Sequence, residues 1–273
     1  MSDQSGSSWR VLNAEQSGDI LICLDFDLAG ARQPLGEAIA AHFRSNQIWS
    51  LRRKSFDLPT HITPVDFSRR IAQHLATGTQ RVVGIVSYCC AWAIARQLQD
   101  SLSPDTDEGT QLPGIEIDAV SATSQFMQSQ YYIALSRLRS GPGRPEALTE
   151  ELNNVHIERG DVWRLAMHLG SRYAEELKKA THEIGIGPAL VEELAGTFQL
   201  YMNYIATCSA DKTLPPSDVT FAINSYRHVA MEGIASPRSM RLNVPRDHLL
   251  ASDQFRRLMS ELLFSRRSQT SES

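Results

Sequence analysis

Short apolar runs alternate along this chain with stretches in which apolar residues recur every three or four positions. Residues 19–26, DILICLDF, have the length of a strand and almost no polar interruption, which is typical of a strand buried on both faces of a sheet. Residues 34–46 then place Leu35, Ile39 and Phe43 on one face of a predicted helix. A buried strand followed by an amphipathic helix predicts a parallel sheet with helices on its faces.

The alternation continues almost to the end of the chain and is interrupted once. Further strands are predicted at 47–52, 81–87, 115–122, 218–223 and 238–245. Further helices are predicted at 67–78, with Asp66 as the N-cap, and at 90–102 and 253–265. We therefore predict an α/β core at 11–125 and 210–266, a helical insertion at 126–209 that acts as a lid, and disordered polar tails at 1–10 and 267–273.

The composition is that of an ordinary globular protein. The 273 residues are 42% hydrophobic and 21% charged, and the formal net charge of −4 leaves no basic excess to neutralise nucleic-acid phosphates. The apolar runs fall short of the roughly 18 residues that suggest a membrane span, and no apolar segment follows a basic start. Cys23, Cys89, Cys90 and Cys208 lack CxxC spacing, so we expect reduced thiols, no disulfide framework and no metal site. These features predict a cytoplasmic protein without a membrane or nucleic-acid partner, and they leave its oligomeric state open.

The segment 81–98, RVVGIVSYCCAWAIARQL, carries the strongest chemical signal. A β-branched run enters a tight Ser-Tyr-Cys-Cys-Ala step and leaves as a helix, which is the strand–turn–helix context of a hydrolase nucleophile. Cys89 would then lie at the carboxyl edge of the sheet, with the backbone N–H of Cys90 pointing at the reacting centre and the helix dipole favouring a thiolate. The alternative is that Cys89 and Cys90 are two small buried apolar residues.

His248 is the candidate base for this thiol. Residues 240–263 predict a strand, a loop and a helix, and Asp247 and His248 lie in the loop. A loop between the last strand and the final helix carries the histidine of α/β-hydrolases, whose imidazole takes the nucleophile's proton and later returns one to the leaving group. Asp247, Glu232 or Asn224 could orient this ring, and the sequence does not choose among them.

The order of these segments resembles the thioesterases of nonribosomal peptide and polyketide assembly lines, from about residue 19 to the final helix. Residues 21–43, LICLDFDLAGARQPLGEAIAAHF, stand where those proteins have a strand, an oxyanion loop and a helix, and residues 244–250, VPRDHLL, resemble their histidine loop. The resemblance implies an α/β-hydrolase fold with a mainly parallel central sheet, helices on both faces and a helical lid. It also implies no bound cofactor, and an acyl group delivered on the phosphopantetheine of a carrier protein. A second oxyanion N–H would come from Phe26 or Asp27, beside that of Cys90.

The chain departs from that family at the turn and at the acid. Ser87 and Ala91 replace the two glycines usual at the turn, and Trp92 occupies a position that is normally small. The places where a triad carboxylate is expected, near 123–125 and at 224–228, hold none. A Cys–His dyad depends less on such an acid than a serine nucleophile does.

Three functions fit these features. We expect first an acyl or aminoacyl transferase that moves a group between carrier-protein thiols through an S-acyl Cys89, in chemistry similar to the cysteine-dependent aminoacyl transferases of nonribosomal pathways. Thioester exchange is close to isoenergetic, so the group can leave again to another thiol. A hydrolytic, editing thioesterase is the first alternative, and a catalytically inactive thioesterase-like scaffold is the second. In a transferase, Asp25 and Asp27 could receive the ammonium of an aminoacyl group, or they could be solvated loop residues.

Overall fold

The computed structural model describes residues 8–14, 16, 19–26, 34–57, 62–75, 81–102, 112–138, 161–182, 185–209, 219–228 and 238–264. Within these ranges one sheet has the strand order β1-β3-β2-β4-β5-β6-β7. β1 pairs antiparallel with β3, and the other neighbouring pairs are parallel. The strands are β1 (Trp9–Leu12), β2 (Ile20–Leu24), β3 (Gln47–Leu51), β4 (Val82–Tyr88), β5 (Gly114–Ile117), β6 (Thr220–Asn224) and β7 (Arg238–Arg241).

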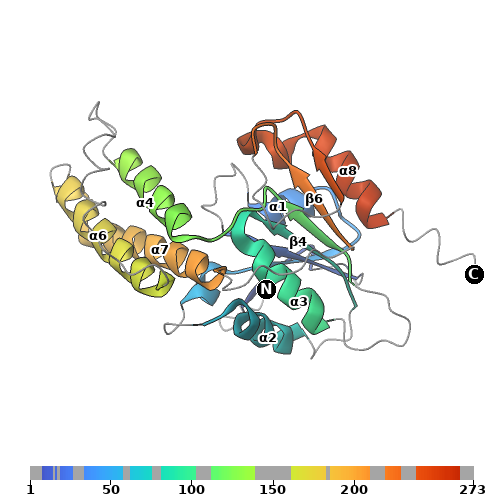
Figure 1. Ribbon diagram of the computed structural model, residues 1–273, viewed down its shortest axis with the longest axis horizontal. Helices are drawn as coiled ribbons and strands as arrows, with labels where there is room; N and C mark the ends of the chain where they lie inside the picture. Colours follow the sequence, from blue (N-terminus) through green and yellow to red (C-terminus); the bar gives the residue numbers. More distant parts are fainter. Residues whose placement is uncertain are drawn as a thin grey trace, which may run out of the picture. The chain divides into compact units, whose positions relative to one another are not determined.

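Helices cover both faces of this sheet, α2 and α3 on one face and α1 and α8 on the other (Figure 1). Because β2 lies between β3 and β4 under these helices, all of its residues are buried, which explains its uninterrupted apolar sequence. The four helices are α1 (Leu35–Ala40), α2 (Pro64–Leu75), α3 (Trp92–Leu102) and α8 (Asp253–Phe264). Short 3-10 turns are η1 (Arg53–Phe56), η2 (Cys89–Ala91) and η3 (Arg246–Ala251). The sheet order, the antiparallel edge strand and the sharp turn after the central strand β4 define the α/β-hydrolase fold, which confirms the predicted fold class.

The chain divides into two compact units, one made of 1–55, 63–120 and 210–273 and the other of 56–62 and 121–209. The second unit is helical and contains α4 (Ser124–Leu138), α6 (Val162–His182) and α7 (Pro188–Thr207). Stacking of Tyr173 on Phe198, with ring centroids 4.0 Å apart, joins α6 to α7. The action of this unit as a lid stays a prediction. No helix in the described ranges is long and apolar enough to cross a membrane.

The first strand was not predicted. Trp9 and Arg10 were predicted to lie in a disordered tail, but both belong to β1. Trp9 is buried and packs on Trp49 of β3, with ring centroids 6.0 Å apart. Burial of this indole gives the short edge strand enough apolar contact to pair.

The cap of α2 also differs from the prediction. The helix begins at Pro64, so Asp66 already lies inside its first turn. Thr63 is the capping residue, because its Oγ1 accepts a hydrogen bond from the Asp66 N–H at 3.1 Å. Proline in the first turn of a helix is favoured, since its missing N–H has no partner there in any case.

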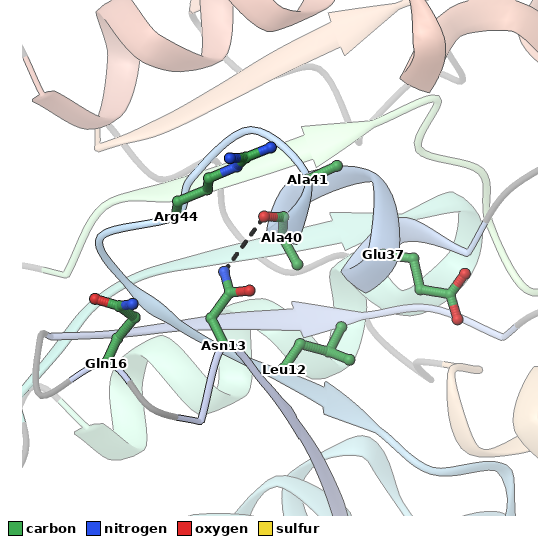
Figure 2. A pocket seen from close by; sticks show the side chains of 7 residues that line it. All are labelled: Leu12, Asn13, Gln16, Glu37, Ala40, Ala41 and Arg44. Carbon is green, nitrogen blue, oxygen red and sulfur yellow. Dashed lines mark hydrogen bonds between the residues drawn. The ribbon is translucent and has the colours of Figure 1, made fainter.

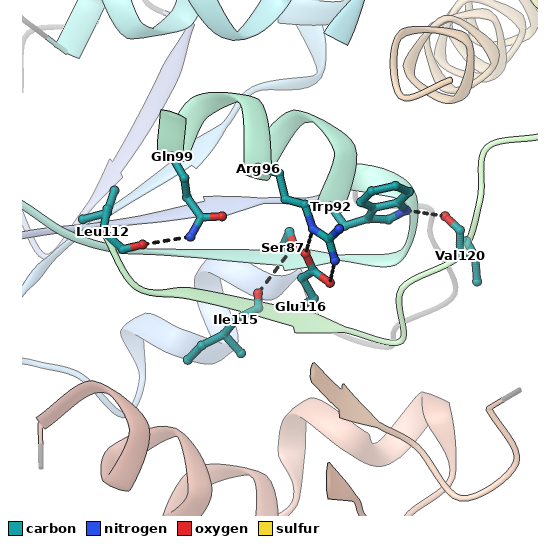
Figure 3. A network of polar contacts seen from close by, with 8 residues as sticks. All are labelled: Ser87, Trp92, Arg96, Gln99, Leu112, Ile115, Glu116 and Val120. Atoms are coloured by element: carbon teal, nitrogen blue, oxygen red, sulfur yellow. Dashed lines mark hydrogen bonds and ion pairs between the residues drawn. The ribbon is translucent and has the colours of Figure 1, made fainter. Parts of the chain in front are cut away.

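A buried ion pair fixes α3 on β5. Arg96 donates from Nε to Glu116 Oε1 at 2.6 Å and from Nη2 to Oε2 at 3.0 Å, and its guanidinium lies 4.8 Å from the Trp92 ring centroid (Figure 3). The Trp92 indole donates to the Val120 carbonyl at 2.8 Å (Figure 3). Trp92, at a position predicted to be crowded, therefore anchors the segment that follows β5 to the first turn of α3.

Candidate active site

The turn after β4 holds Cys89 in a conformation that few residues adopt. Cys89 has a φ of 61°, in the left-handed region, while Tyr88 before it is extended and Trp92 after it is helical. A non-glycine residue held there costs about 1–3 kcal/mol, and such strain clusters at functional sites. The strand–turn–helix element predicted around Cys89 is therefore present, with the sharp backbone turn that presents a nucleophile.

The strain gives a stability prediction. Cys89→Gly should be more stable than Cys89→Ala by about 1 kcal/mol, because glycine takes a positive φ at no steric cost whereas alanine keeps the strain. Urea unfolding of the two purified variants under identical conditions measures the difference. Equal stability, or a more stable alanine variant, would contradict a strained turn.

The Cys89 thiol is buried and its exposed fraction is 2%. A hydrogen bond with the Cys90 thiol and burial raise the pKa of Cys89, and the nearby Arg246 guanidinium lowers it, with a net result well above the ordinary thiol value. The thiol is therefore protonated at neutral pH in this conformation. A reaction at Cys89 requires its surroundings to open and a base to approach.

Arg246, the first residue of η3, joins Cys89 to the surrounding polar groups. Its Nε donates to the Tyr88 hydroxyl at 2.8 Å and lies 3.9 Å from Asp118 Oδ2, and its guanidinium also hydrogen-bonds to Cys89. Burial raises the pKa of Tyr88 to about 12, so its hydroxyl is a neutral acceptor for this bond. Arg246 also lines a pocket of about 490 Å³, together with Pro245 and residues 225–228. The guanidinium thus lies between this pocket and the thiol.

Asp118 is the carboxylate that sequence reasoning missed. The strand predicted at 115–122 ends at Ile117, because Asp118 has a φ of 45° and turns the chain. Asp118 is fully buried, and its Oδ1 accepts a hydrogen bond from the Ser225 N–H at 2.7 Å. Its Oδ2 accepts no hydrogen bond from the described residues. A buried carboxylate therefore lies directly after β5, several residues before 123–125, where the sequence analysis looked for one.

His228 lies beside this carboxylate and was not predicted as a site residue. Its Nδ1 is 3.7 Å from Asp118 Oδ1, and its Nε2 donates to the Ala119 carbonyl at 3.0 Å. Burial lowers the pKa of His228, although Asp118 and the bond to Ala119 act to raise it. Because Nε2 already bonds a backbone carbonyl, this ring holds the segment after β5 in place.

The predicted base, His248, is in η3 but is not brought to the thiol. Its side chain is 52% exposed, and its Nε2 lies 3.5 Å from the carboxylate of Asp247, one of the predicted orienting residues. Arg246, two residues earlier in the same turn, is the residue of η3 that contacts Cys89. The predicted loop therefore contributes a residue that contacts the thiol, but which of its side chains faces Cys89 depends on the conformation of η3.

Two of the predicted oxyanion donors, Phe26 and Cys90, follow strands that end at the same edge of the sheet. β2 and β4 pair up to Leu24 and Ser87, so Phe26 and Cys89 each follow two residues after a paired position. Cys90 is the second residue of η2, the turn into α3, where backbone N–H groups point out of the helix end. Asp27, the other predicted donor, and Glu232, a predicted orienting residue, lie outside the described residues.

Asp25 and Asn224, also predicted as site residues, both make hydrogen bonds that stabilise the fold. Asp25 is buried, and its Oδ2 accepts a hydrogen bond from the Leu35 N–H at 2.8 Å, at the start of α1. Asn224 is the last residue of β6, and its carbonyl accepts from the Leu242 N–H at 2.8 Å. Asp25 thus stabilises a helix N-terminus, and the buried residue is not the solvated loop carboxylate that was the alternative.

A second pocket lies at the opposite edge of the sheet, near the start of β3, where Leu12 pairs with Ile48 (Figure 2). It has a volume of about 530 Å³, and Asn13 lies in its wall with a φ of 55°. The Asn13 amide donates to the Ala40, Phe43 and Asn46 carbonyls, the first of these bonds being drawn in Figure 2. Asn13 therefore caps the end of α1. These hydrogen bonds explain the position of its side chain, and no ligand is needed to explain it.

No protein-family model matches the chain, and no curated protein sequence matches it. Among solved structures, it is similar to the NocB thioesterase domain, determined as a covalent complex with a fluorophosphonate nocardicin G analogue, with 10% identity, coverage of 94% of this chain and 99% of that chain, and a TM-score of 0.48. It is also similar to SrfTE, the thioesterase domain that cyclises the lipopeptide antibiotic surfactin, with 11% identity, 94% of each chain covered and a TM-score of 0.49. An α/β-hydrolase fold protein from Nakamurella multipartita is 15% identical, with 93% and 94% covered and a TM-score of 0.45.

Proposed function

We propose that the protein is a thioester-processing enzyme in which Cys89 takes an acyl group from a carrier-protein pantetheine and passes it to a second thiol. The observation that carries this proposal is the Cys89 turn, where a thiol has a positive φ at the end of the central strand of an α/β-hydrolase sheet. A cysteine in this place forms a thioester, and a thioester is a good donor to another thiol. An acyl or aminoacyl transferase therefore remains the preferred function, in the biosynthesis of natural products.

The buried thiol requires two changes before it reacts. Arg246 has to withdraw from Cys89, and a base has to replace it. We propose His248 as this base, because it lies in the same short turn as Arg246, directly after the last strand. Asp118 supports this assignment, since its buried Oδ2 accepts no hydrogen bond from the described residues and could accept one from an imidazole N–H.

In the proposed reaction, His248 accepts the Cys89 proton as Sγ attacks the thioester carbonyl. The carbonyl oxygen becomes an oxyanion that the backbone N–H of Cys90 and that of Phe26 or Asp27 stabilise. Collapse breaks the bond to the pantetheine sulfur, which leaves with the proton from His248. A second thiol then attacks S-acyl Cys89 in the reverse sequence and regenerates the free cysteine.

The test is intact-mass spectrometry of the protein after incubation with acyl- or aminoacyl-loaded carrier protein. A mass increase equal to the acyl group, present in the wild type and in Cys208→Ala but absent in Cys89→Ala, is the expected result. Cys208 is a suitable control because it is also a buried thiol, at the end of α7. Addition of a second, unloaded carrier should then discharge the adduct and load that carrier.

The other outcomes identify the alternatives. Fast release of free acid without loading of the second carrier identifies a hydrolytic thioesterase and contradicts transfer. Absence of an adduct and of free acid with all loaded carriers identifies an inactive scaffold, in which the buried, protonated thiol is only a packing residue.

A further inference from the structure

We infer that the pocket beside Cys89 selects thioesters whose acyl chain carries a carboxylate, and that Arg246 binds this carboxylate. The inference rests on the proposed function and names the substrate class for the same thiol. It uses the pocket of about 490 Å³ lined by Ser225, Tyr226, Arg227, His228, Pro245 and Arg246. A volume of this size is sufficient for a small organic acyl group.

The charges around this pocket favour an anion. Its described lining residues include two arginines and no carboxylate. Asp118 is not among the described lining residues; its Oδ2 lies 3.9 Å from Arg246 Nε and its Oδ1 lies 3.7 Å from His228 Nδ1. The two guanidinium groups give the described wall of the pocket an excess of positive charge, and a planar guanidinium can bind a carboxylate through two parallel hydrogen bonds.

The position of Arg246 indicates that the anion it binds belongs to the acyl group and not to the pantetheine arm. Arg246 hydrogen-bonds to the Cys89 thiol and also lines the pocket, so a group that it binds in the pocket lies near the acyl chain of a thioester that reacts at Cys89. The phosphate of a pantetheine arm lies far along the arm from the thioester, on the leaving-group side. The carboxylate is therefore assigned to the acyl group.

Binding of the carboxylate also supplies the opening that the buried thiol requires. Arg246 donates its Nε to the Tyr88 hydroxyl, a neutral acceptor, at 2.8 Å. A substrate carboxylate is a stronger acceptor for the same guanidinium, because both partners are then charged. Arg246 would turn from Tyr88 and Cys89 toward the pocket, and the thiol would become more accessible with an anionic acyl group than with a neutral one.

The described residues do not favour a substrate whose acyl group carries an ammonium. Asp25, for which binding of a substrate ammonium was one of two interpretations, is buried and accepts a hydrogen bond from the Leu35 N–H. The described residues that line the pocket offer no negative charge to an ammonium.

The test compares two N-acetylcysteamine thioesters of nearly equal shape, glutaryl and its neutral methyl ester, by the rate of S-acylation of Cys89 in intact-mass measurements. The glutaryl thioester should react about ten- to a hundredfold faster, as expected for one hydrogen-bonded charge pair. Neither compound contains a phosphate, so a preference between them comes from the acyl carboxylate. A glutaryl thioester of phosphopantetheine, compared with that of pantetheine, measures any separate contribution from the arm and should show none.

Variants identify the residue responsible. Arg246→Met should remove the preference for glutaryl, and Arg227→Met, at an exposed position, should reduce it without a risk to folding. Arg69→Met is the matched control, since Arg69 lies on α2 in an exposed pair with Asp66, and it should keep the full preference.

Equal rates for the two thioesters, or faster reaction of the methyl ester, would overturn the inference and leave the proposed function standing. The inference also fails if the wild type prefers glutaryl and both arginine variants keep that preference. Absence of acylation by either thioester, when the loaded carriers also give no adduct, overturns the proposed function and the inference together.

Discussion

Replacing His248 with glutamine is expected to slow S-acylation of Cys89 by about 10²- to 10⁴-fold, the usual contribution of a positioned general base. The physical reason is the high pKa of the Cys89 thiol. The hydrogen bond with Cys90 and burial raise this pKa well above the ordinary value, so very little thiolate exists at neutral pH without a base. Intact-mass time courses with a loaded carrier or a small thioester measure the rate, and the loss should be smaller at high pH, where hydroxide can replace the imidazole.

His228→Gln is the matched comparison for this prediction. His228 is buried beside Asp118, and its Nε2 donates to the Ala119 carbonyl, so it holds the segment after β5 rather than accepting the thiol proton. Its replacement should therefore cost less activity than that of His248, and the loss should not depend on pH in the same way. A larger loss in His228→Gln, with both variants folded, would contradict His248 as the base and assign the role to His228.

The second large effect concerns stability. Arg96→Met should destabilise the protein by about 3–5 kcal/mol, because it leaves the carboxylate of Glu116 buried without its counter-charge. The side chains of Arg96 and Glu116 are only 4% and 2% exposed, and water cannot replace the lost guanidinium. Urea unfolding at neutral pH, followed by tryptophan fluorescence, measures the change.

The double variant Arg96→Met/Glu116→Leu is the control for this prediction. Replacement of both charges by apolar side chains removes the desolvation cost together with the attraction, so most of the lost stability should return. If the double variant is as unstable as Arg96→Met alone, the loss comes from packing on Trp92 and not from the unpaired carboxylate.

The effect of Arg96→Met should also depend on pH. Burial raises the pKa of Glu116, whereas Arg96 lowers it, so removal of Arg96 raises the pKa of this carboxyl further. The folded variant then keeps a proton that the unfolded chain has lost, and its stability falls as the pH rises from the ordinary carboxyl pKa to the raised value. The destabilisation relative to the wild type should be smallest in acid and largest above that window. A destabilisation that is independent of pH would exclude the buried carboxylate as its cause.

The sequence pattern predicted most elements of the fold because the burial of a strand or helix requires apolar residues at regular positions close together in the chain. Five apolar residues in a row in β2 follow from helices on both faces of the sheet, and the amphipathic repeat of α8 follows from packing on one face. The predictions failed at the first strand and at the start of α2. Pairing of β1 depends on the contact of Trp9 with Trp49, which is close in space but distant in sequence. Capping by Thr63 depends on the exact residue at which α2 begins.

Asp118 shows why the acid was missed. The sequence from 115 to 122 continues to alternate, so nothing local marks the end of β5. The strand ends where pairing with β6 ends, at Ile117 opposite Ile223, and that register belongs to the assembled sheet.

The sequence by itself determined the order of strands and helices after β1, the placement of Cys89 at a strand-to-helix turn and the loop that carries His248, because each of these depends on residues close together in the chain. Only the tertiary structure decided which side chains meet there. Tyr88 ends β4, Asp118 follows β5 and Arg246 begins η3, and their contacts form only once the sheet has assembled. The thiol is therefore in contact with a guanidinium that the pattern did not identify. The sequence left the acyl group open, and that contact is the observation from which we infer an anionic one.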